Sequence, residues 1–367
     1  MKILCSGAGP AGLYFSLLLK NFLPDCEIII HERQQPRLTT GWGVILHNDL
    51  LNSMYINDIA SYKKINGCLQ KLSGINITSD SENVLLPEYS FNSISRAKLI
   101  SILQERCEDL GVNIVYNSDF DINSIDVEDY SLVVLADGHN STNRNKLFSL
   151  DNNNTIIGEN KYIWLGLDGS LDESFNFIFI DTGKGIIWAH NYRYDERHST
   201  FVVEMSLETW CNLDFDKLEY SDAVDKIQNL FQHKIHNLKI IKAKNISNFW
   251  LNYNHVNSKN WFINNTVLLG NSAHNAHFSI GSGTRLAIDD AICLANLIKS
   301  SQYIDEMVLS NYENQRKDVS YKLKEYANNS MTWFERIPTE LIESDIHLFA
   351  QMLKNRAKLL KNNIDYS

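Results

Sequence analysis

The chain has 367 residues, which is enough for one large domain or two modest ones. Its composition, 44% hydrophobic and 21% charged with only 5 Pro and 17 Gly, is that of an ordinary globular protein and excludes disordered, collagen-like and coiled-coil chains. Asp and Glu outnumber Lys and Arg by 44 to 34, so the net charge is -10 and a nucleic-acid partner is not expected.

The N-terminus predicts a strand, a turn, a helix and a second strand. Lys2–Ser6 is a short apolar strand, residues 7–12 form a glycine turn, 13–22 form a helix, and 27–31 form a strand with three isoleucines. The uncharged run 3–19 is broken by glycines and a proline, which favours this unit over a signal peptide or membrane span. Such a unit builds a parallel sheet with right-handed crossovers.

The pattern changes along the rest of the chain. Residues 162–205 hold short strands rich in aromatic and β-branched residues, which predict an antiparallel sheet. Parallel-sheet features return at 266–269, and the chain is predicted to be helical after Gly283. A helix that begins at Ser95 and strands at 112–116 and 132–136 complete the first sheet, and residues 151–155 are expected to be a loop crossing between domains. The sequence therefore predicts an α/β fold with an inserted antiparallel domain and C-terminal helices.

The cysteines and the basic residues of the chain each allow one interpretation. Six cysteines occur without a CxxC spacing, which suits a reducing, cytoplasmic compartment. The richest basic stretch, formed by Lys354, Arg356, Lys358 and Lys361, is interpreted as a solvated helix face, with a phosphate contact as the alternative.

The first candidate site is an unbroken GxGxxG segment between a strand and a helix, followed 20 residues later by Glu32. The glycines allow a pyrophosphate to approach the helix N-terminus, and the acidic residue can accept ribose hydroxyls. A plain glycine turn is the alternative, and this unit alone does not separate FAD from NAD. The predicted cofactor-binding residues here are Gly7, Gly9, Pro10, Ala11, Gly12, Glu32 and Arg33.

Two further segments separate FAD from NAD. One is DGHNSTNR at 137–144, which follows a predicted strand and is accompanied by Arg96 at the start of a helix. The other is the glycine-rich stretch 267–284. Together they resemble the nucleotide-binding half of the class A flavoprotein monooxygenases. One position differs, since this chain has Asn271 where the family has Asp. The residues that this resemblance assigns to FAD are Arg96, Asp137, Gly138, Gly270, Asn271, Gly281, Ser282, Gly283 and Thr284.

The resemblance extends over nearly the whole chain. Six segments are similar to the subgroup of 2-aminobenzoyl-CoA monooxygenase, salicyloyl-CoA 5-hydroxylase and the violacein-pathway indole hydroxylase. They are GLYF at 12–15, GWGV at 41–44, LQERC at 103–107, STFVVE at 199–204, HFSIGSGT at 277–284 and NSMTWFE at 329–335. The resemblance implies a p-hydroxybenzoate hydroxylase-like fold. Its FAD-binding domain comprises 1–70, 90–155 and 260–300, its substrate domain 71–89 and 156–259, and its C-terminal helical segment 301–367.

The resemblance also implies an activity. NADH or NADPH reduces FAD, O2 is the co-substrate, and a flavin C4a-hydroperoxide passes one oxygen atom to an aromatic ring. The implied substrate is an aminobenzoyl or salicyloyl thioester, tethered to CoA or a carrier, or an indole-type biosynthetic intermediate. The alternative is an accessory protein that binds FAD without hydroxylating anything, for which Asn271 is the direct support. A plain NAD-dependent dehydrogenase is disfavoured by the second and third sites, and the sequence leaves the oligomeric state open.

Several residues are expected near the flavin ring and the substrate. Glycines on both sides of Trp42 permit a close backbone approach, so Trp42 and Gly43 are expected beside the isoalloxazine, with a buried loop tryptophan as the alternative. His277 either faces the substrate or flavin, as the candidate catalytic residue, or has a structural role. Three alternate residues of one strand either line an aromatic substrate pocket or pack in the core: Trp188, His190 and Tyr192.

Two pairs of residues resemble other kinds of site. His274 and His277 have a spacing found in metal sites, but no third ligand recurs nearby, so no metal is expected. Asp289 and Asp290 resemble a catalytic carboxylate pair, but neighbours on a helix point in different directions, which favours a surface or helix-packing role.

Overall fold

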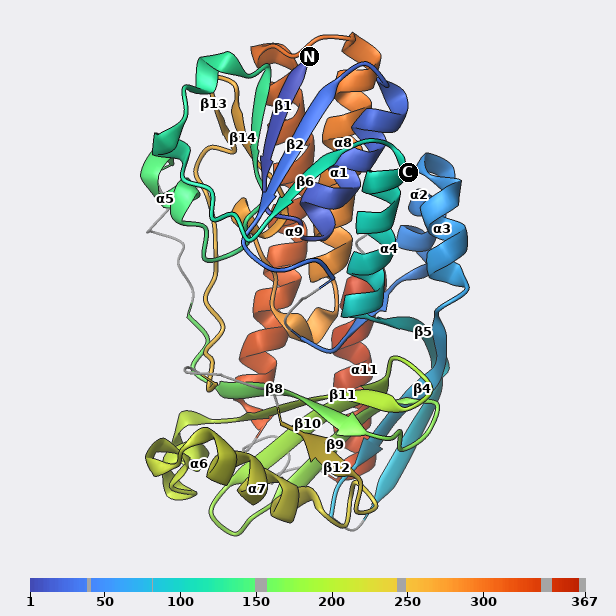
Figure 1. Ribbon diagram of the computed structural model, residues 1–367. Helices are drawn as coiled ribbons and strands as arrows, with labels where there is room; N and C mark the ends of the chain where they lie inside the picture. Colours follow the sequence, from blue (N-terminus) through green and yellow to red (C-terminus); the bar gives the residue numbers. More distant parts are fainter. Residues whose placement is uncertain (38–40, 81, 149–156, 243–248, 338–344, 363–367) are drawn as a thin grey trace.

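The computed structural model describes residues 1–37, 41–80, 82–148, 157–242, 249–337 and 345–362, the last seven of these as backbone only. It contains two sheets, one above the other in Figure 1, with helices on both. The long helix α9 (Glu306–Glu335) runs from the upper sheet to the lower one. The expected loop at 151–155 lies outside the described residues.

The upper sheet has six strands in the order β13-β14-β7-β1-β2-β6. All neighbouring strands are parallel except β13 and β14. Its strands are nearly continuous apolar runs because helices cover it, as is usual for parallel sheets. Their bounds are β1 (Lys2–Ser6), β2 (Glu27–Glu32), β6 (Asn113–Tyr116), β7 (Leu132–Leu135), β13 (Phe262–Ile263) and β14 (Thr266–Leu268).

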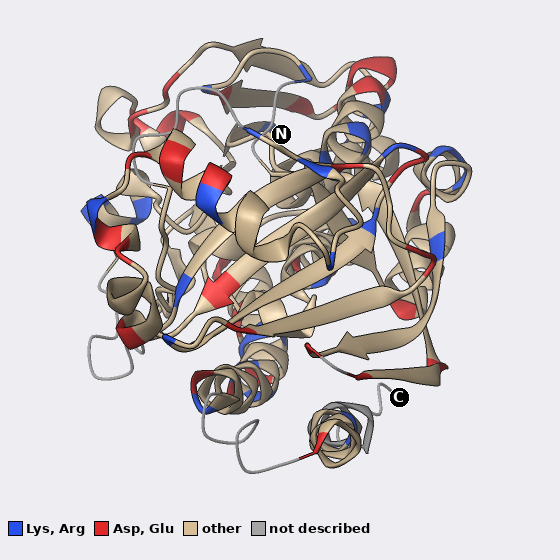
Figure 2. Cartoon of the chain, turned by 90° about the horizontal axis from the view of Figure 1, so that it is seen from below, with Lys and Arg blue, Asp and Glu red and all other residues tan. Residues whose placement is uncertain are grey.

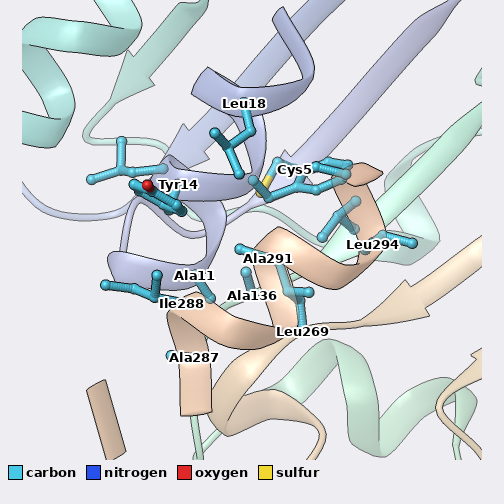
Figure 3. Close-up of a cluster of buried hydrophobic side chains, with 14 of the residues drawn as sticks. Cys5, Ala11, Tyr14, Leu18, Ala136, Leu269, Ala287, Ile288, Ala291 and Leu294 are labelled. Carbon is cyan, nitrogen blue, oxygen red and sulfur yellow. The ribbon is translucent and has the colours of Figure 1, made fainter. Parts of the chain in front are cut away.

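Helices α1 (Pro10–Phe22) and α8 (Gly283–Ser301) pack against each other beside this sheet. Small side chains, among them Ala11, Ala287 and Ala291, lie where the helices meet, and larger side chains such as Leu18 and Leu294 lie around them (Figure 3). The small residues allow the helices to approach closely, and the starts of both helices therefore lie near each other.

The lower sheet has eight strands in the order β12-β8-β11-β10-β9-β4-β5-β3. It is antiparallel except where β4 meets β9. Its strands are β3 (Gly43–Leu46), β4 (Gln70–Thr78), β5 (Asn83–Ser95), β8 (Lys161–Asp168), β9 (Phe175–Asp181), β10 (Ile186–Arg193), β11 (His198–Met205) and β12 (Lys239–Ile241).

The two faces of the lower sheet differ because side chains alternate along each strand. Ile163, Phe201 and Val203 belong to an aliphatic cluster that includes residues of α7 (Tyr220–Phe231). On the other face, Phe177 and Trp188 pack with Phe334 of α9. We call this second side the aromatic face, and it consists of Tyr162, Trp164, Phe177, Phe179, Trp188, His190, Val202 and Glu204, as the strand register shows.

The described part of the chain has six further α-helices. They are α2 (Asn48–Asn57), α3 (Ile59–Asn66), α4 (Arg96–Asp109), α5 (Thr142–Leu147), α6 (Leu207–Asn212) and α11 (Ile346–Asn362). Lys354 of α11 forms an ion pair with Glu88, while the side chains of Arg356, Lys358 and Lys361 lie outside the described residues. Within the described part of the chain, no helix is both long and apolar enough to span a bilayer. Seen from below, basic and acidic residues are interspersed over the elements (Figure 2).

The predicted fold class, α/β with a second antiparallel sheet and C-terminal helices, is confirmed. The first helix starts at Pro10 rather than residue 13, because a proline is favourable in the first turn. The expected division placed 1–70 and 90–155 with the upper sheet, whereas β3 and the end of β5 pair within the lower sheet. The reason is that β5 continues without a break to Ser95, where its side chain caps α4.

Candidate functional site

Four neighbouring strands of the upper sheet end at the same edge, and each is followed by a predicted site segment. β14 leads to Gly270 and Asn271, β7 to Asp137 and Gly138, β1 to Gly7, and β2 ends at Glu32. Strand β1 lies between β2 on one side and β7 on the other, so the chain connections leave β1 in opposite directions. This edge is therefore a topological switch point. Ligands of open α/β sheets bind at such a point, outside the carboxyl ends of the strands.

The glycine turn is tightly packed on one side and open on the other. A Cβ atom on Gly7 would lie 2.5 Å from the carbonyl oxygen of Ala136, and one on Gly12 would lie 2.2 Å from that of Gly7, so both positions need glycine. Gly9 is the N-cap of α1, and a Cβ atom there would meet no atom of the described residues within 4 Å. Gly9 therefore leaves open space beside the start of the helix.

Glu32 is held against the glycine turn. Its Oε2 accepts a hydrogen bond of 2.7 Å from the backbone N–H of Ala8, and its Oε1 accepts one of 2.8 Å from that of Gln34. Arg33 follows it and is close enough to His139 for its charge to contribute to a lowered pKa of that imidazole, whose main cause is burial. Strands β1 and β2 thus present a fixed carboxylate beside the open turn.

The segment after β7 is joined to the segment after β14. The hydroxyl of Ser272 donates to Asp137 Oδ1 at 3.2 Å and accepts from the backbone N–H of Gly138 at 2.9 Å. Arg144 donates a hydrogen bond of 3.2 Å to the carbonyl oxygen of Ser272, so this arginine holds the segment after β14 in place. A Cβ atom on Gly138 would meet no atom within 4 Å in the part of the chain that the structure describes, which leaves this turn open as well.

A buried ionic cluster lies beneath Gly270. Asp290 is fully buried and contacts Arg316 Nε at 2.6 Å and His274 Nε2 at 2.7 Å, and it accepts a hydrogen bond from the backbone N–H of Gly270. Burial raises the pKa of Asp290, but the charges of His274 and Arg316 outweigh burial and lower it. Asp290 therefore has a helix-packing role, which is one of the two roles that the sequence favoured. Asn271, which follows Gly270, is exposed at the open edge.

Trp42 and Gly43 lie where the two sheets meet. The indole N–H of Trp42 donates to the carbonyl oxygen of Trp164 at 3.2 Å, and a Cβ atom on Gly166 would lie 2.6 Å from the indole. The backbone N–H of Arg96 donates to the carbonyl oxygen of Trp42, which joins the start of α4 to this loop. The hydroxyl of Tyr192 donates to the carbonyl oxygen of Gly43 at 2.9 Å.

The loop 277–284 leads from the upper sheet to the aromatic face. His277 is buried, accepts a hydrogen bond from the backbone N–H of Ser279 and contacts the Ser279 hydroxyl at 2.8 Å, so its ring caps its own loop. Gly281 adopts a left-handed conformation with φ +62°, next to Ile45 of β3. Ser282 begins α8 without a side-chain cap, which leaves the backbone N–H groups of the first turn available.

Phe278 of this loop reaches the aromatic face. Its ring centroid lies 4.7 Å from that of Tyr162 and 5.7 Å from that of His190. His190 is also in contact with Phe177 and Phe334, at 4.8 and 5.2 Å between centroids. Tyr162, Phe177, His190, Phe278 and Phe334 form a set of rings that we call the aromatic box.

A carboxylate lies at one side of the aromatic box. Glu204 is 1% exposed, and it accepts hydrogen bonds from Asn160 Nδ2 at 2.8 Å and from the indole N–H of Trp188 at 3.2 Å. Burial raises the pKa of Glu204, but contact with His190 and the charge of His277 outweigh burial and lower it. The site therefore contains a buried ionised carboxylate among aromatic rings.

Glu204 and Phe278 were not among the residues expected in the site. Both lie in segments that carry the family resemblance, but neither was assigned a role. The feature that identifies Glu204 is an acidic residue within the otherwise apolar strand 201–205, since carboxylates are almost never fully buried without a partner. Register places it directly opposite Trp188 and Tyr162, which no local pattern predicts.

The residues at the open edge suit a dinucleotide such as FAD. Among the described residues, no atom lies within 4 Å of where a Cβ atom on Gly9, Gly138 or Gly283 would be. Helices α1 and α8 begin without side-chain caps, whereas the first turns of α4 and α9 are capped by Ser95 and Asp305. Uncapped helix starts beside small residues can hold a pyrophosphate or another anionic group.

A metal site is not part of this arrangement in the described residues, where no group of three or more His, Cys, Asp or Glu side chains could hold an ion. His274 is instead paired with Asp290 and stacked on Trp261, with 4.6 Å between ring centroids.

An open groove of about 800 Å³ lies on the outer side of α2, α8 and α9, where it is lined by residues that include Asp49, Arg285 and Asp289.

Known proteins share both the sequence and the fold. Salicyloyl-CoA 5-hydroxylase from Streptomyces sp is 30% identical over 344 residues, which is 91% of this chain and 65% of that protein. The chain thus spans somewhat less than two thirds of its length. 3-hydroxy-4-methyl-anthranilyl-(aryl-carrier protein) 5-monooxygenase from Streptosporangium sibiricum is 28% identical, covering 92% and 90%. Protodeoxyviolaceinate monooxygenase from Chromobacterium violaceum is 28% identical, covering 98% and 95%.

Solved structures show the same fold at lower identity, although no protein-family model matches the sequence. 2-methyl-3-hydroxypyridine-5-carboxylic acid oxygenase superposes with a TM-score of 0.70 at 14% identity, covering 89% of this chain and 91% of that one. PqsL from Pseudomonas aeruginosa, a probable FAD-dependent monooxygenase, superposes with a TM-score of 0.68 at 16% identity, covering 91% and 96%.

With these relatives, the chain is related in sequence to the class A FAD-dependent aromatic monooxygenases. The resemblance found in the sequence is therefore confirmed. Within that class, the chain is related to the salicyloyl-CoA, aryl-carrier and violacein-pathway monooxygenases at 28 to 30% identity.

Proposed function

We propose that the chain is a monooxygenase that uses FAD, NADH or NADPH, and O2 to hydroxylate an aromatic ring. The observation that supports this most strongly is the arrangement of the loop 277–284. It follows the segment 270–276 that comes after β14, contacts the aromatic box through Phe278, and ends at the uncapped start of α8. One loop therefore connects the expected cofactor site with a buried aromatic surface.

Each part of the site has a proposed task toward FAD. Glu32 would accept the ribose hydroxyls, the open turn at Gly9 would hold the pyrophosphate, and the turns at Gly138 and Asn271 would contact the ribitol side of the pyrophosphate. Trp42 and the start of α8 would border the flavin ring. FAD supplies the redox chemistry when bound, by taking a hydride from NADH or NADPH and activating O2, while the chain orients the ring and excludes water.

The substrate that we propose is an aromatic ring, either in an aminobenzoyl or salicyloyl thioester or in an indole-type intermediate. The aromatic box supports a ring, because Phe278 already packs against Tyr162 and His190 there. Two of the relatives are described as acting on groups bound to CoA or to an aryl-carrier protein, and a third belongs to the violacein pathway. The six free cysteines support work in a reducing compartment such as the cytoplasm.

The proposal is tested by substrate-stimulated oxidation of NADH and NADPH by the FAD-loaded protein. The candidates are 2-aminobenzoyl-CoA, salicyloyl-CoA and indolic compounds, and products are identified by mass spectrometry. We expect one class to accelerate oxidation and to gain one oxygen atom. Oxidation that no candidate accelerates, with substrate recovered unchanged, would contradict the proposal.

A second candidate is an accessory protein that binds FAD without hydroxylation. It is favoured by one observation, since Asn271 occupies an exposed position at the open edge where the resembling family has Asp. This candidate predicts bound FAD together with no candidate-stimulated oxidation, so the same experiment separates the two functions.

A further inference from the structure

The buried carboxylate of Glu204 has no task in the proposed function so far. It lies on the aromatic face of β11, directly opposite Trp188 of β10 and Tyr162 of β8. Both of its oxygens accept hydrogen bonds, from Asn160 and Trp188. Burying a charge costs several kcal/mol unless it is well paired, so a carboxylate at this position is expensive to maintain.

Glu204 is oriented toward His190. The Nε2 atom of His190 lies 3.6 Å from Glu204 Oε2, at ion-pair distance, and has no hydrogen-bond partner among the described residues. Both side chains are at least 96% buried. The carboxylate therefore favours the tautomer that carries its proton on Nε2, because the negative charge attracts that proton.

In that tautomer the Nδ1 atom carries no proton and can accept a hydrogen bond. The His190 ring is in contact with Phe177, Phe278 and Phe334, so it forms part of the aromatic box rather than of the aliphatic core. An aromatic substrate in this box would lie against a histidine whose remaining ring nitrogen accepts a hydrogen bond.

We propose that His190, held in this tautomer by Glu204, accepts a hydrogen bond from a hydroxyl or amino group on the substrate ring, so that the site selects rings bearing such a donor. This inference rests on the proposed function for the location of the substrate. His190 is the contacting residue and Glu204 is a positioning residue. Accepting the hydrogen bond also increases electron density on the substituent, which favours attack on the ring by an electrophilic oxygen.

Other charged groups surround the pair. His277 of the loop 277–284 contributes a charge that lowers the pKa of Glu204, after the contact with His190. Glu335 at the end of α9 has a raised pKa, mainly through burial, with the charge of Glu204 as one further cause. The hydroxyl of Tyr162 has its pKa raised to about 12, by burial first and by Glu204 second. Tyr162 is therefore neutral, and Glu204 is the carboxylate at ion-pair distance from His190.

The test measures binding by the FAD-loaded protein, independently of turnover. The ligands are three thioesters of N-acetylcysteamine, whose acyl groups are salicyloyl, 2-aminobenzoyl and benzoyl, and dissociation constants are obtained by calorimetry. We expect the wild-type chain to bind the first two at least about tenfold more tightly than the benzoyl ester, as is usual for a hydrogen bond to a strongly polarised group. Glu204→Gln and His190→Phe should both bring this ratio close to unity.

The ratio separates recognition from general damage. A variant with a merely disturbed pocket would bind all three esters more weakly and leave the ratio unchanged. Glu208→Gln, which neutralises an exposed carboxylate in α6, is the matched control and should keep the wild-type ratio. If Glu204→Gln does not fold, His190→Phe decides the question, because phenylalanine fits among the rings of the box.

Three results would overturn the inference: no ring preference in the wild-type chain, no binding of any of the three esters, or a preference that persists in the variants. The proposed function fails by a different result. A ring preference without any stimulated oxidation of NADH or NADPH would contradict the hydroxylase and leave the role of the pair intact. Stimulated oxidation without a ring preference would contradict the role of the pair and leave the proposed hydroxylase intact.

Discussion

The carboxylate of Glu32 accepts a hydrogen bond of 2.7 Å from the backbone N–H of Ala8, so the end of β2 is fixed to the glycine turn that follows β1. The acidic residue and the turn are 24 positions apart and form one unit. This geometry places a negative charge where a ribose is expected, and it makes the carboxylate part of the turn's own structure.

Glu32→Gln should weaken FAD binding about tenfold or more. The amide keeps one acceptor oxygen, but it cannot both accept from Ala8 and Gln34 and offer two charged oxygens to ribose hydroxyls. The measurement is an FAD titration followed by flavin fluorescence. Glu27→Gln, an exposed change at the start of the same strand, should bind FAD as the wild-type chain does.

Gly9→Val should abolish FAD binding while leaving the fold intact. The new Cβ atom meets no atom of the described chain within 4 Å, and φ at Gly9 is -78°, so the backbone tolerates valine. The side chain instead fills the space proposed for the pyrophosphate. The circular dichroism spectrum and the thermal unfolding of Gly9→Val should match those of the wild-type chain. The control variant Gly67→Ala should match the wild-type chain in the same measurements and should bind FAD normally. A folded variant that retains a full complement of FAD would remove this turn from the site.

Asn271→Asp should leave FAD affinity equal or improve it. Asn271 is exposed at the open edge, so an added charge has little desolvation cost, and a carboxylate accepts hydrogen bonds from hydroxyl groups more strongly than an amide does. Dissociation constants for both forms provide the comparison, with Asn66→Asp in α3 as the control for added charge. A clear loss of FAD in Asn271→Asp would show that the amide N–H groups are required.

Asp290→Asn should destabilise the protein by about 3 to 5 kcal/mol, the range found when one partner of a buried ion pair is removed. Arg316 would remain 8% exposed, without its charge partner, and the hydrogen bond to Gly270 would weaken. Urea unfolding measures the change. Asp289→Asn removes the neighbouring carboxylate, whose pKa is already raised by burial, and should cost less than about 1 kcal/mol. Equal effects of the two changes would contradict this account of the cluster.

Stability should fall as the pH is lowered through the range in which histidine ionises. Burial, with smaller contributions from Lys324 and His274, lowers the pKa of His255 to about 3. An unfolded histidine titrates near pH 6.5, so between these values the unfolded chain binds a proton that the folded chain does not. Unfolding free energies at about pH 7.5 and about pH 4.5 measure the loss. The loss should be smaller in His255→Asn, and an unchanged pH dependence would remove His255 as a cause.

Much of the FAD edge could be predicted from the sequence because its features are local. The glycine turn, Glu32 and the Asp137–Gly138 pair each follow an apolar strand, and parallel strands bring their ends together. The exchange of β3 and the end of β5 into the lower sheet was not predictable in this way. Their pairing depends on contacts between segments that lie far apart in the sequence.

The substrate side was predicted less completely. Trp188 and His190 were expected on one face, and they do share it, but Trp188 packs against Phe334 and donates to Glu204, whereas Tyr192 bonds to Gly43. His277, expected as a candidate catalytic residue, caps its own loop. The position of Glu204 depends on the register of three strands, which only the folded sheet defines. The roles of these residues remain proposals.

The most direct test of the central claim is an absorption spectrum of the purified chain, recorded after incubation with FAD and removal of the free cofactor. The account predicts a protein-bound flavin spectrum with close to one FAD for each chain, and little or none in Gly9→Val. A wild-type chain that retains no flavin under these conditions would contradict the assignment of the open edge to FAD, and with it the proposed hydroxylase.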